Sequence, residues 1–172
     1  MVAARQVGEL PVGLADSKVL TKKRREALFY DIEIACELGQ GWVTPAEINK
    51  IGLAKAMRLA VRRAMSNLGV GRDEEVIMDG PVNYCMKKFG RVQCVIDADA
   101  SCPLVSAASI YAKVLRDRYM TDIAPKYPVY RFEKHVGYGT KLHREMLNLH
   151  GITDLHRISY KPIQNMLAAL EA

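Results

Sequence analysis

Residues 75–80 read Glu-Val-Ile-Met-Asp-Gly, a short apolar run that ends on an acid and a glycine. A run of this length, closed by a turn signal, is typical of a buried strand. Residues 92–97, Val-Gln-Cys-Val-Ile-Asp, have the same form. An amphipathic helix is predicted before the pair at Leu53–Leu68, and a helix rich in small residues follows at Leu104–Met120. Helices that alternate with short apolar strands indicate an α/β domain.

The remaining chain fits the same class. Outside the central stretch, the predicted elements are a strand at Val2–Ala4, a helix from Thr21 that is stopped by Gly39 and Gly41, a strand at residues 41–44, a short helix opened by Pro45, a loop at residues 134–143 and a mostly helical tail from Lys141. Gly69 is the predicted C-terminal cap of the central helix. The pattern predicts one α/β domain that ends in helices.

Composition limits the function only broadly. The 172 residues carry a net charge of +6, which weakly favours a polyanionic partner because many basic proteins bind no nucleic acid. The four cysteines form no C-x-x-C pair, so free thiols in a reducing cytosol are expected. No apolar run approaches the ~18 residues of a membrane span. We expect a cytoplasmic monomer without a membrane partner.

Acids stand at the ends of both predicted strands. A carboxylate that leaves a buried strand is held firmly at a sheet edge, where Mg²⁺ can bridge it to a phosphate. Asp79 ends the first strand, and Asp97 and Asp99 follow the second. Taken singly, Asp79 before Gly80 is also typical of an ordinary turn, and the later pair is also typical of solvated acids. The acids therefore predict a metal site only as a set.

Two further stretches have features of phosphate or sugar contacts. Asp16-Ser17-Lys18 precedes a basic predicted helix, so the lysine and the backbone N–H groups can meet a phosphate, although an ordinary helix cap has the same pattern. In His135–His143 a tyrosine stands between two glycines and a lysine follows. A phenol ring can stack on a sugar or base and the lysine can meet a phosphate, although a structural turn stays open.

These stretches together resemble the ribonuclease HII family over essentially the whole chain. Each one is weakly specific, but their order and spacing are highly specific. The stretches that carry the resemblance are Gly13–Glu26, Pro45–Asn49, Ile77–Gly80, Val105–Asp117, Tyr127–Pro128, His135–His143 and His156–Pro162.

The resemblance implies an RNase H-like mixed sheet flanked by helices, with a C-terminal helical extension. It divides the chain into a catalytic part, residues 1–130, and a substrate-recognition loop with helices, residues 131–172. It also implies four acids that bind a divalent metal, Mg²⁺ or Mn²⁺. Asp79 matches the third acid. Asp99 matches the fourth, at a place where Asp97-Ala98-Asp99 stands for the family's usual Lys-Gly-Asp.

Substrate contacts follow from the same resemblance. Tyr138 matches the family tyrosine that packs on the sugar at an RNA–DNA junction. Ser17, Lys18 and Lys141 are expected to bind the substrate, the two lysines at phosphates. Val136 stands where the family usually has a lysine, so one expected phosphate contact is absent.

The family's first two acids lie in an Asp-Glu-x-Gly-Arg-Gly motif that does not occur in this sequence. The only acid before Asp16 is Glu9, in a turn beside Pro11. We therefore expect the first central strand to be missing and the 172-residue chain to be inactive or severely impaired. A late start in the gene model and a truncated, inactive paralogue both fit. The strand-like start and the other intact motifs favour the late start.

The implied activity is hydrolysis of the RNA strand of RNA–DNA hybrids, including single ribonucleotides embedded in DNA. Two metal ions would leave 5′-phosphate and 3′-hydroxyl ends. The implied roles are excision of ribonucleotides from DNA and removal of primer RNA. One alternative is a non-catalytic hybrid-binding paralogue. A second is a basic DNA-binding regulator that uses one of the two long helices, which the strand-end acids argue against.

Overall fold

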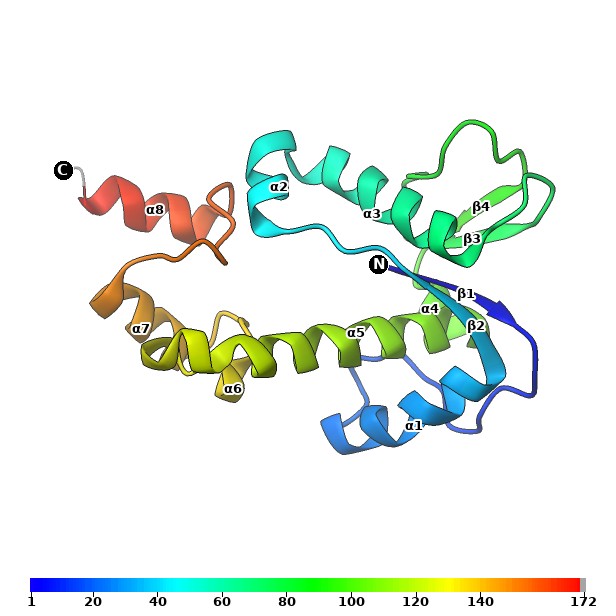
Figure 1. Cartoon of the computed structure of the whole chain (residues 1–172), viewed down its shortest axis with the longest axis horizontal. Helices are drawn as coiled ribbons and strands as arrows, with labels where there is room; N and C mark the ends of the chain where they lie inside the picture. The colour runs from blue at the N-terminus through cyan, green and yellow to red at the C-terminus, as the bar shows by residue number, and fades with distance from the viewer. Residues whose placement is uncertain (171–172) are drawn as a thin grey trace. The chain divides into compact units, whose positions relative to one another are not determined.

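The computed structural model describes residues 1–170, which form two compact units (Figure 1). Unit 1 comprises Met1–Trp42 and Met57–Val114, and unit 2 comprises Val43–Ala56 and the chain from Leu115 onward. The helices α3 (Leu53–Leu68) and α5 (Pro103–Ile123) each contribute residues to both units. The expected boundary at residue 130 stays a prediction.

Unit 1 contains two pairs of strands. β1 (Val2–Gln6) pairs antiparallel with β2 (Cys36–Gln40). β3 (Val76–Asp79) pairs parallel with β4 (Val92–Val95), in a register that sets Asp79 opposite Val95. Figure 1 shows β1 and β2 as one ribbon pair and β3 with β4 as another, the latter beside α3. The predicted strands at residues 2–4, 75–79 and 92–97 are confirmed, so the acids do follow strands.

The chain between α1 and α2 differs from the prediction. Thr21 caps α1 (Lys22–Ala35), as expected, but β2 begins directly at Cys36 and the predicted strand at residues 41–44 is wrong. Gly39 and Gly41 do not stop the helix. A Cβ on either would overlap the backbone of α3, at the carbonyl groups of Ala64 and Ala60 respectively. The glycines therefore allow close packing of the chain at and just after β2 against α3, a long-range contact that local sequence does not show.

The other predicted helices form where expected. Thr44 and Glu47 make a capping box for α2 (Pro45–Ile51), and Gly69 follows α3 with φ of 69°. A short helix α4 (Ala98–Ser101) precedes α5. Small residues let the start of α5 pack tightly, since Ala107 is fully buried and Ser106 nearly so.

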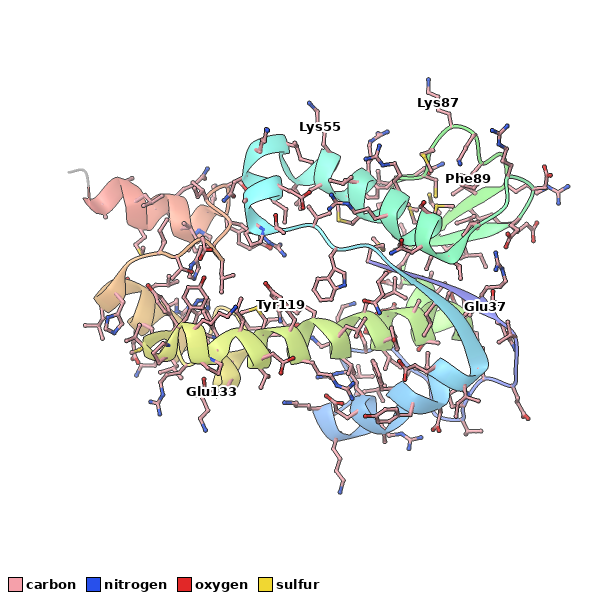
Figure 2. The ribbon with its side chains drawn as sticks, viewed as in Figure 1. Glu37, Lys55, Lys87, Phe89, Tyr119 and Glu133 are labelled. Atoms are coloured by element: carbon pink, nitrogen blue, oxygen red, sulfur yellow. The ribbon has the colours of Figure 1, made fainter. Side chains whose placement is uncertain are left out.

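Two apolar clusters hold unit 1 together. Phe29 of α1 stacks on Tyr111 of α5 with ring centroids 4.4 Å apart. A second cluster packs the 80–91 loop against α3. It consists of Val61, Met65, Cys85 and Phe89. Figure 2 shows Phe89 beneath this loop and Lys87 projecting from it. The loop between β3 and β4 is thus anchored, so the ends of these strands are held in a defined position.

An apolar cavity of about 500 Å³ lies inside unit 1. Its wall comes from β1, α3, β3 and α5, and includes Met57, Val61, Met65, Leu104 and Val105. Among the described residues, β1 and β3 are not paired with each other, and each belongs to a separate two-stranded sheet. The expectation of a missing central strand stays a prediction.

Unit 2 is built from short helices around one aromatic cluster. Its elements include the 3₁₀ turns η1 (Ala124–Lys126) and η2 (Pro128–Tyr130) and the helices α6 (Phe132–His135), α7 (Lys141–His150) and α8 (Lys161–Leu170). Tyr130 stacks on Phe132, with centroids 5.4 Å apart, and Leu147 and Ile163 join them in the core. The predicted helical tail is confirmed.

The structure also bears on membrane spans and on the cysteines. Across the described residues, no helix combines the length and apolar character needed to cross a membrane. Cys36, Cys85, Cys94 and Cys102 are all free thiols. Burial raises the pKa of the Cys36 and Cys85 thiols, so both stay protonated and unreactive at neutral pH.

Candidate active site

The carboxyl ends of β3 and β4 bring two acids together. Asp79 is the last residue of β3, and its Oδ1 accepts a hydrogen bond from the backbone N–H of Ala98, 3.0 Å away. Asp99 lies in the first turn of α4, one residue after that N–H. Parallel pairing forces both strands to end at one edge, so the acid that ends β3 meets the helix that follows β4.

Asp97 and Asp99 differ sharply in their surroundings. Asp97 is exposed, takes a left-handed backbone conformation with φ of 52°, and makes no side-chain cap for α4. Asp99 is only 4% exposed, and its Oδ2 lies 3.8 Å from the ammonium of Lys18. Of the two acids in this turn, Asp99 is therefore the one that the fold places in the cluster.

The Asp16-Ser17-Lys18 turn reaches the same acids. Lys18 Nζ lies 3.6 Å from Asp16 Oδ2 as well as 3.8 Å from Asp99. The Lys18 backbone N–H donates to Asp16 Oδ1 at 2.9 Å, which closes the turn. Sequence reasoning named Lys18 and missed Asp16, although an acid two residues before the lysine was a usable signal.

The α5 helix holds this turn from behind. Ser17 is 4% exposed, and its hydroxyl lies 3.0 Å from that of Ser109. The hydroxyl of Ser106 donates to the carbonyl of Ala15 at 2.8 Å. Ser17 thus has a clear structural contact, and its predicted contact with a substrate stays a prediction.

The electrostatics of the cluster are those of a cation site. Burial raises the pKa of Asp99, and the negative charges of Asp16 and Asp79 raise it further. Asp16 and then Asp99 raise the pKa of Lys18, so the lysine stays charged. Three carboxylates face one ammonium, which leaves an excess of negative charge that an added cation would relieve.

The carboxylate oxygens of Asp79 and Asp99 are suitable ligands for a hard divalent cation, but they fill only part of its ligand shell. Carboxylate oxygens are the ligands that Mg²⁺ and Mn²⁺ prefer. Within residues 1–170, no group of three or more His, Cys, Asp or Glu side chains is arranged to hold a metal ion. Asp79 and Asp99 can therefore supply oxygen ligands while substrate phosphate, water or other acids complete the shell.

Two of the predicted substrate-binding residues, Tyr138 and Lys141, lie in unit 2, whereas Ser17 and Lys18 lie in unit 1. Tyr138 is 46% exposed, stands between Gly137 and Gly139, and packs under the guanidinium of Arg116, 4.5 Å from the ring centroid. Lys141 begins α7 and is 87% exposed, with only a surface ion pair to Glu145 at 3.8 Å. An accessible ring and an accessible ammonium in one segment fit contact with a nucleic acid, and this role stays a prediction.

The family model for ribonuclease HII matches residues 3–163. The ribonuclease HII of Shewanella piezotolerans is 43% identical over 157 residues, which is 91% of this chain and 76% of that protein. That of a Marinomonas species is 44% identical over 159 residues, covering 90% and 77% of the two chains. The chain belongs to the ribonuclease HII family.

Solved structures of ribonucleases support the fold. The ribonuclease HII of Archaeoglobus fulgidus, from a complex with PCNA, has a TM-score of 0.77 at 24% identity and covers 96% of this chain and 87% of that one. The ribonuclease H2 of Pyrococcus horikoshii has a TM-score of 0.66 at 22% identity, covering 99% and 98%. The expected α/β fold of the ribonuclease H type is therefore confirmed. All the acids and loop residues described above lie within the matched ribonuclease HII region.

Proposed function

We propose that this ribonuclease HII family member acts on the RNA strand of RNA–DNA hybrids, including single ribonucleotides embedded in DNA. The family supports an RNase H-type endonuclease. The observation that carries the proposal is the meeting of Asp79, Asp99 and Lys18 at the carboxyl ends of two parallel strands. In open α/β sheets this edge is where ligands bind.

The proposed cofactor is Mg²⁺ or Mn²⁺, held by Asp79 and Asp99. Asp79 and Asp99 would hold such an ion, which would supply Lewis-acid activation of water and charge neutralisation at the scissile phosphate; the products would carry 5′-phosphate and 3′-hydroxyl ends. A solved relative by fold, an RNase HIII 15% identical to this chain with a TM-score of 0.64, is described as a complex with Mn²⁺. The proposal covers both metals and does not select between Mg²⁺ and Mn²⁺.

The chain's own residues have separate tasks in this scheme. Burial raises the pKa of Asp99, and the nearby Lys18 opposes that rise, so the lysine favours the ionised form that can offer an oxygen ligand. Lys18 is itself free enough, at 73% exposed, to turn toward a phosphate. Tyr138 packs on the sugar at the junction, and Lys141 meets a phosphate of the backbone. The RNA strand is marked by its 2′-hydroxyl group.

The proposed biological setting is the cytoplasm, with roles in removing ribonucleotides during DNA replication and repair. The reduced thiols and the nucleic-acid substrate support this setting. We propose a monomer, with hybrid duplex as the partner. The domain roles follow the same scheme: residues 1–130 hold the metal, and residues 131–172 recognise the substrate.

A catalytically dead hybrid-binding paralogue is the second candidate. The observation that favours it is that the Asp-Glu-x-Gly-Arg-Gly motif does not occur in the 172 residues, so two of the four family acids have no counterpart in them. Such a protein would bind hybrids through Lys18, Tyr138 and Lys141 without cutting them.

Cleavage by an extended chain separates the two candidates. The chain is joined after the Asp-Glu-x-Gly-Arg-Gly segment of a ribonuclease HII relative and assayed on a DNA duplex with one ribonucleotide. We expect metal-dependent cutting that Asp79→Asn and Asp99→Asn abolish. Asp97→Asn is the matched control, since Asp97 is exposed and asparagine tolerates its left-handed backbone. Tight hybrid binding without any cutting would establish the dead paralogue.

A further inference from the structure

Three histidines form a buried group behind the Tyr138 loop, and the proposed function gives them no task. His135, His143 and His156 are each 5–7% exposed. The rings of His135 and His143 stack, with centroids 4.4 Å apart and planes 15° from parallel. Nε2 of His143 lies 3.2 Å from Nε2 of His156. The edge of the buried Phe132 ring packs against His135 and His143.

Every ring nitrogen of the trio has a partner, and the partners fix where each proton sits. Nδ1 of His156 accepts from the Thr153 backbone N–H, so Nε2 carries the proton and donates to His143. Nδ1 of His135 accepts from the Gly137 N–H, so its Nε2 donates to the Tyr130 carbonyl. His143 accepts at Nε2, and its Nδ1 therefore donates to the Tyr138 carbonyl at 3.0 Å. This hydrogen-bond pattern assigns one tautomer to each ring.

The histidines hold the recognition loop at two adjacent residues, Gly137 and Tyr138. The Gly137 N–H is held by His135, and the Tyr138 carbonyl by His143. Between α6 and this carbonyl the chain passes through Val136, whose φ of 42° is costly for a β-branched residue. Strained backbone persists only where its surroundings over-determine it, and the histidine contacts provide that constraint.

We propose that His143, backed by His156 and His135, is a positioning residue that fixes the Tyr138 backbone so that the ring is presented to the nucleic acid. The proposal rests on the proposed function of Tyr138. It requires that His143 stay neutral, because a proton on its Nε2 would face the N–H of His156. Burial lowers the pKa of both His143 and His156, which favours the neutral forms.

Few charged groups act on the trio. The carboxylate of Asp154 raises the pKa of His156 against the larger effect of burial, and it also accepts a hydrogen bond from the Tyr127 hydroxyl. His150 lies against the Tyr130 ring. The neighbouring imidazole of His135 lowers the pKa of both His143 and His156, and His156 also lowers the pKa of His143. Acidification below the usual histidine pKa should therefore loosen the loop, because a charged His143 cannot accept the hydrogen bond from His156.

Ring NMR spectra of the whole 172-residue chain give a test that does not depend on activity. Long-range ¹H–¹⁵N correlations at pH 7.5 should show a protonated Nδ1 and a bare Nε2 for His143. His135 and His156 should show the opposite tautomer. A charged His143, or a proton on its Nε2, would overturn the proposal.

A matched pair of variants tests the link to Tyr138. Asparagine places an amide near Nδ1, and glutamine places one near Nε2, so only His143→Asn keeps a donor for the Tyr138 carbonyl. Loss of one hydrogen bond predicts that His143→Gln speeds amide exchange at residues 136–140 by about fivefold to tenfold. His143→Asn should change it less. His150→Gln, at an exposed site on the same helix, is the control.

The same variants are measured for binding to a duplex with one ribonucleotide and to a continuous hybrid. His143→Gln should reduce the preference between the two, and it should add nothing in a Tyr138→Ala background, because both changes remove the same contact. Full additivity would overturn the positioning role. If the NMR spectra and exchange rates match these expectations but neither the parent chain nor any variant binds hybrids, the proposed function is wrong. The hydrogen bonds from the histidines to the loop would still be supported.

Discussion

At the residue scale, Asp99 is buried and is a proposed metal ligand. Its burial lowers the stability of the metal-free fold at neutral pH. Its pKa is raised by burial first and then by the charges of Asp16 and Asp79. A carboxyl whose pKa is higher in the folded state holds its proton more tightly there. The metal-free fold therefore becomes more stable as the pH falls through this raised pKa, and the ionised form is a cost at neutral pH.

Asp99→Asn should therefore have opposite effects on stability and on metal binding. The metal-free variant should unfold at a higher temperature than the parent at pH 7. Mn²⁺ at about 100 times its Kd should stabilise the parent by about 2.7 kcal/mol, and the variant by far less. Thermal unfolding with and without Mn²⁺ measures both effects. Equal metal stabilisation of parent and variant would show that Asp99 is not a ligand.

The Tyr138 ring carries a prediction about substrate choice. In the extended chain described above, Tyr138→Ala should lower cleavage at a lone ribonucleotide about 10-fold or more, which corresponds to roughly 1–3 kcal/mol of stacking. Cleavage within continuous RNA should suffer less, and Tyr138→Phe should retain most of the preference because it keeps the ring. An unchanged ratio of the two rates in Tyr138→Ala would make the loop a structural turn.

Lys141 should behave differently, because it is an exposed charge at the start of α7. Lys141→Ala should weaken binding to both substrates equally and lower the slope of log affinity against log salt by about 1. Titrations at several salt concentrations measure this slope. A selective loss for one substrate would contradict a phosphate contact.

At the element scale, close packing of the chain around β2 against α3 depends on two glycines. A Cβ on Gly41 would overlap the backbone of α3 at Ala60, which neither segment can relieve without moving. Gly41→Ala should therefore cost about 3 kcal/mol or more of unfolding free energy. Gly90→Ala is the control, since nothing lies within 4 Å of its Cβ position, and it should be neutral or slightly stabilising. Chemical denaturation measures the unfolding free energy of both variants. If Gly41→Ala is as stable as Gly90→Ala, the chain near Gly41 is not closely packed against α3.

At the scale of the whole molecule, the ligand shell decides activity. Two carboxylates and a neighbouring Asp16 are few ligands for a hard cation. The 172-residue chain alone should therefore cut a duplex with one ribonucleotide little or not at all in Mg²⁺, while the extended chain cuts it. Robust cutting by the chain alone would mean that another acid of the chain, such as Glu9 or Asp16, completes the shell.

The sequence by itself determined most of the elements, though not β2, and it indicated the family. Residues 53–68 form a helix because their apolar spacing follows the helical period, and residues 76–79 form a strand because a short apolar run ends in a turn signal. Both are local effects, readable without a fold. Asp79 and Asp99 were placed at strand ends for the same reason, and the order of the motifs indicated ribonuclease HII.

Only the tertiary structure decided which groups meet. Asp16 joins Asp99 and Lys18 because α5 holds its turn against the strand ends, and local sequence showed only a helix start there. Gly39 and Gly41 were taken for helix stops because their contacts with α3, at Ala64 and Ala60, lie far away along the chain. His143 and His156 share a hydrogen bond only after the helices of unit 2 pack. Such contacts arise from close packing between distant segments, which the period of a single segment cannot encode.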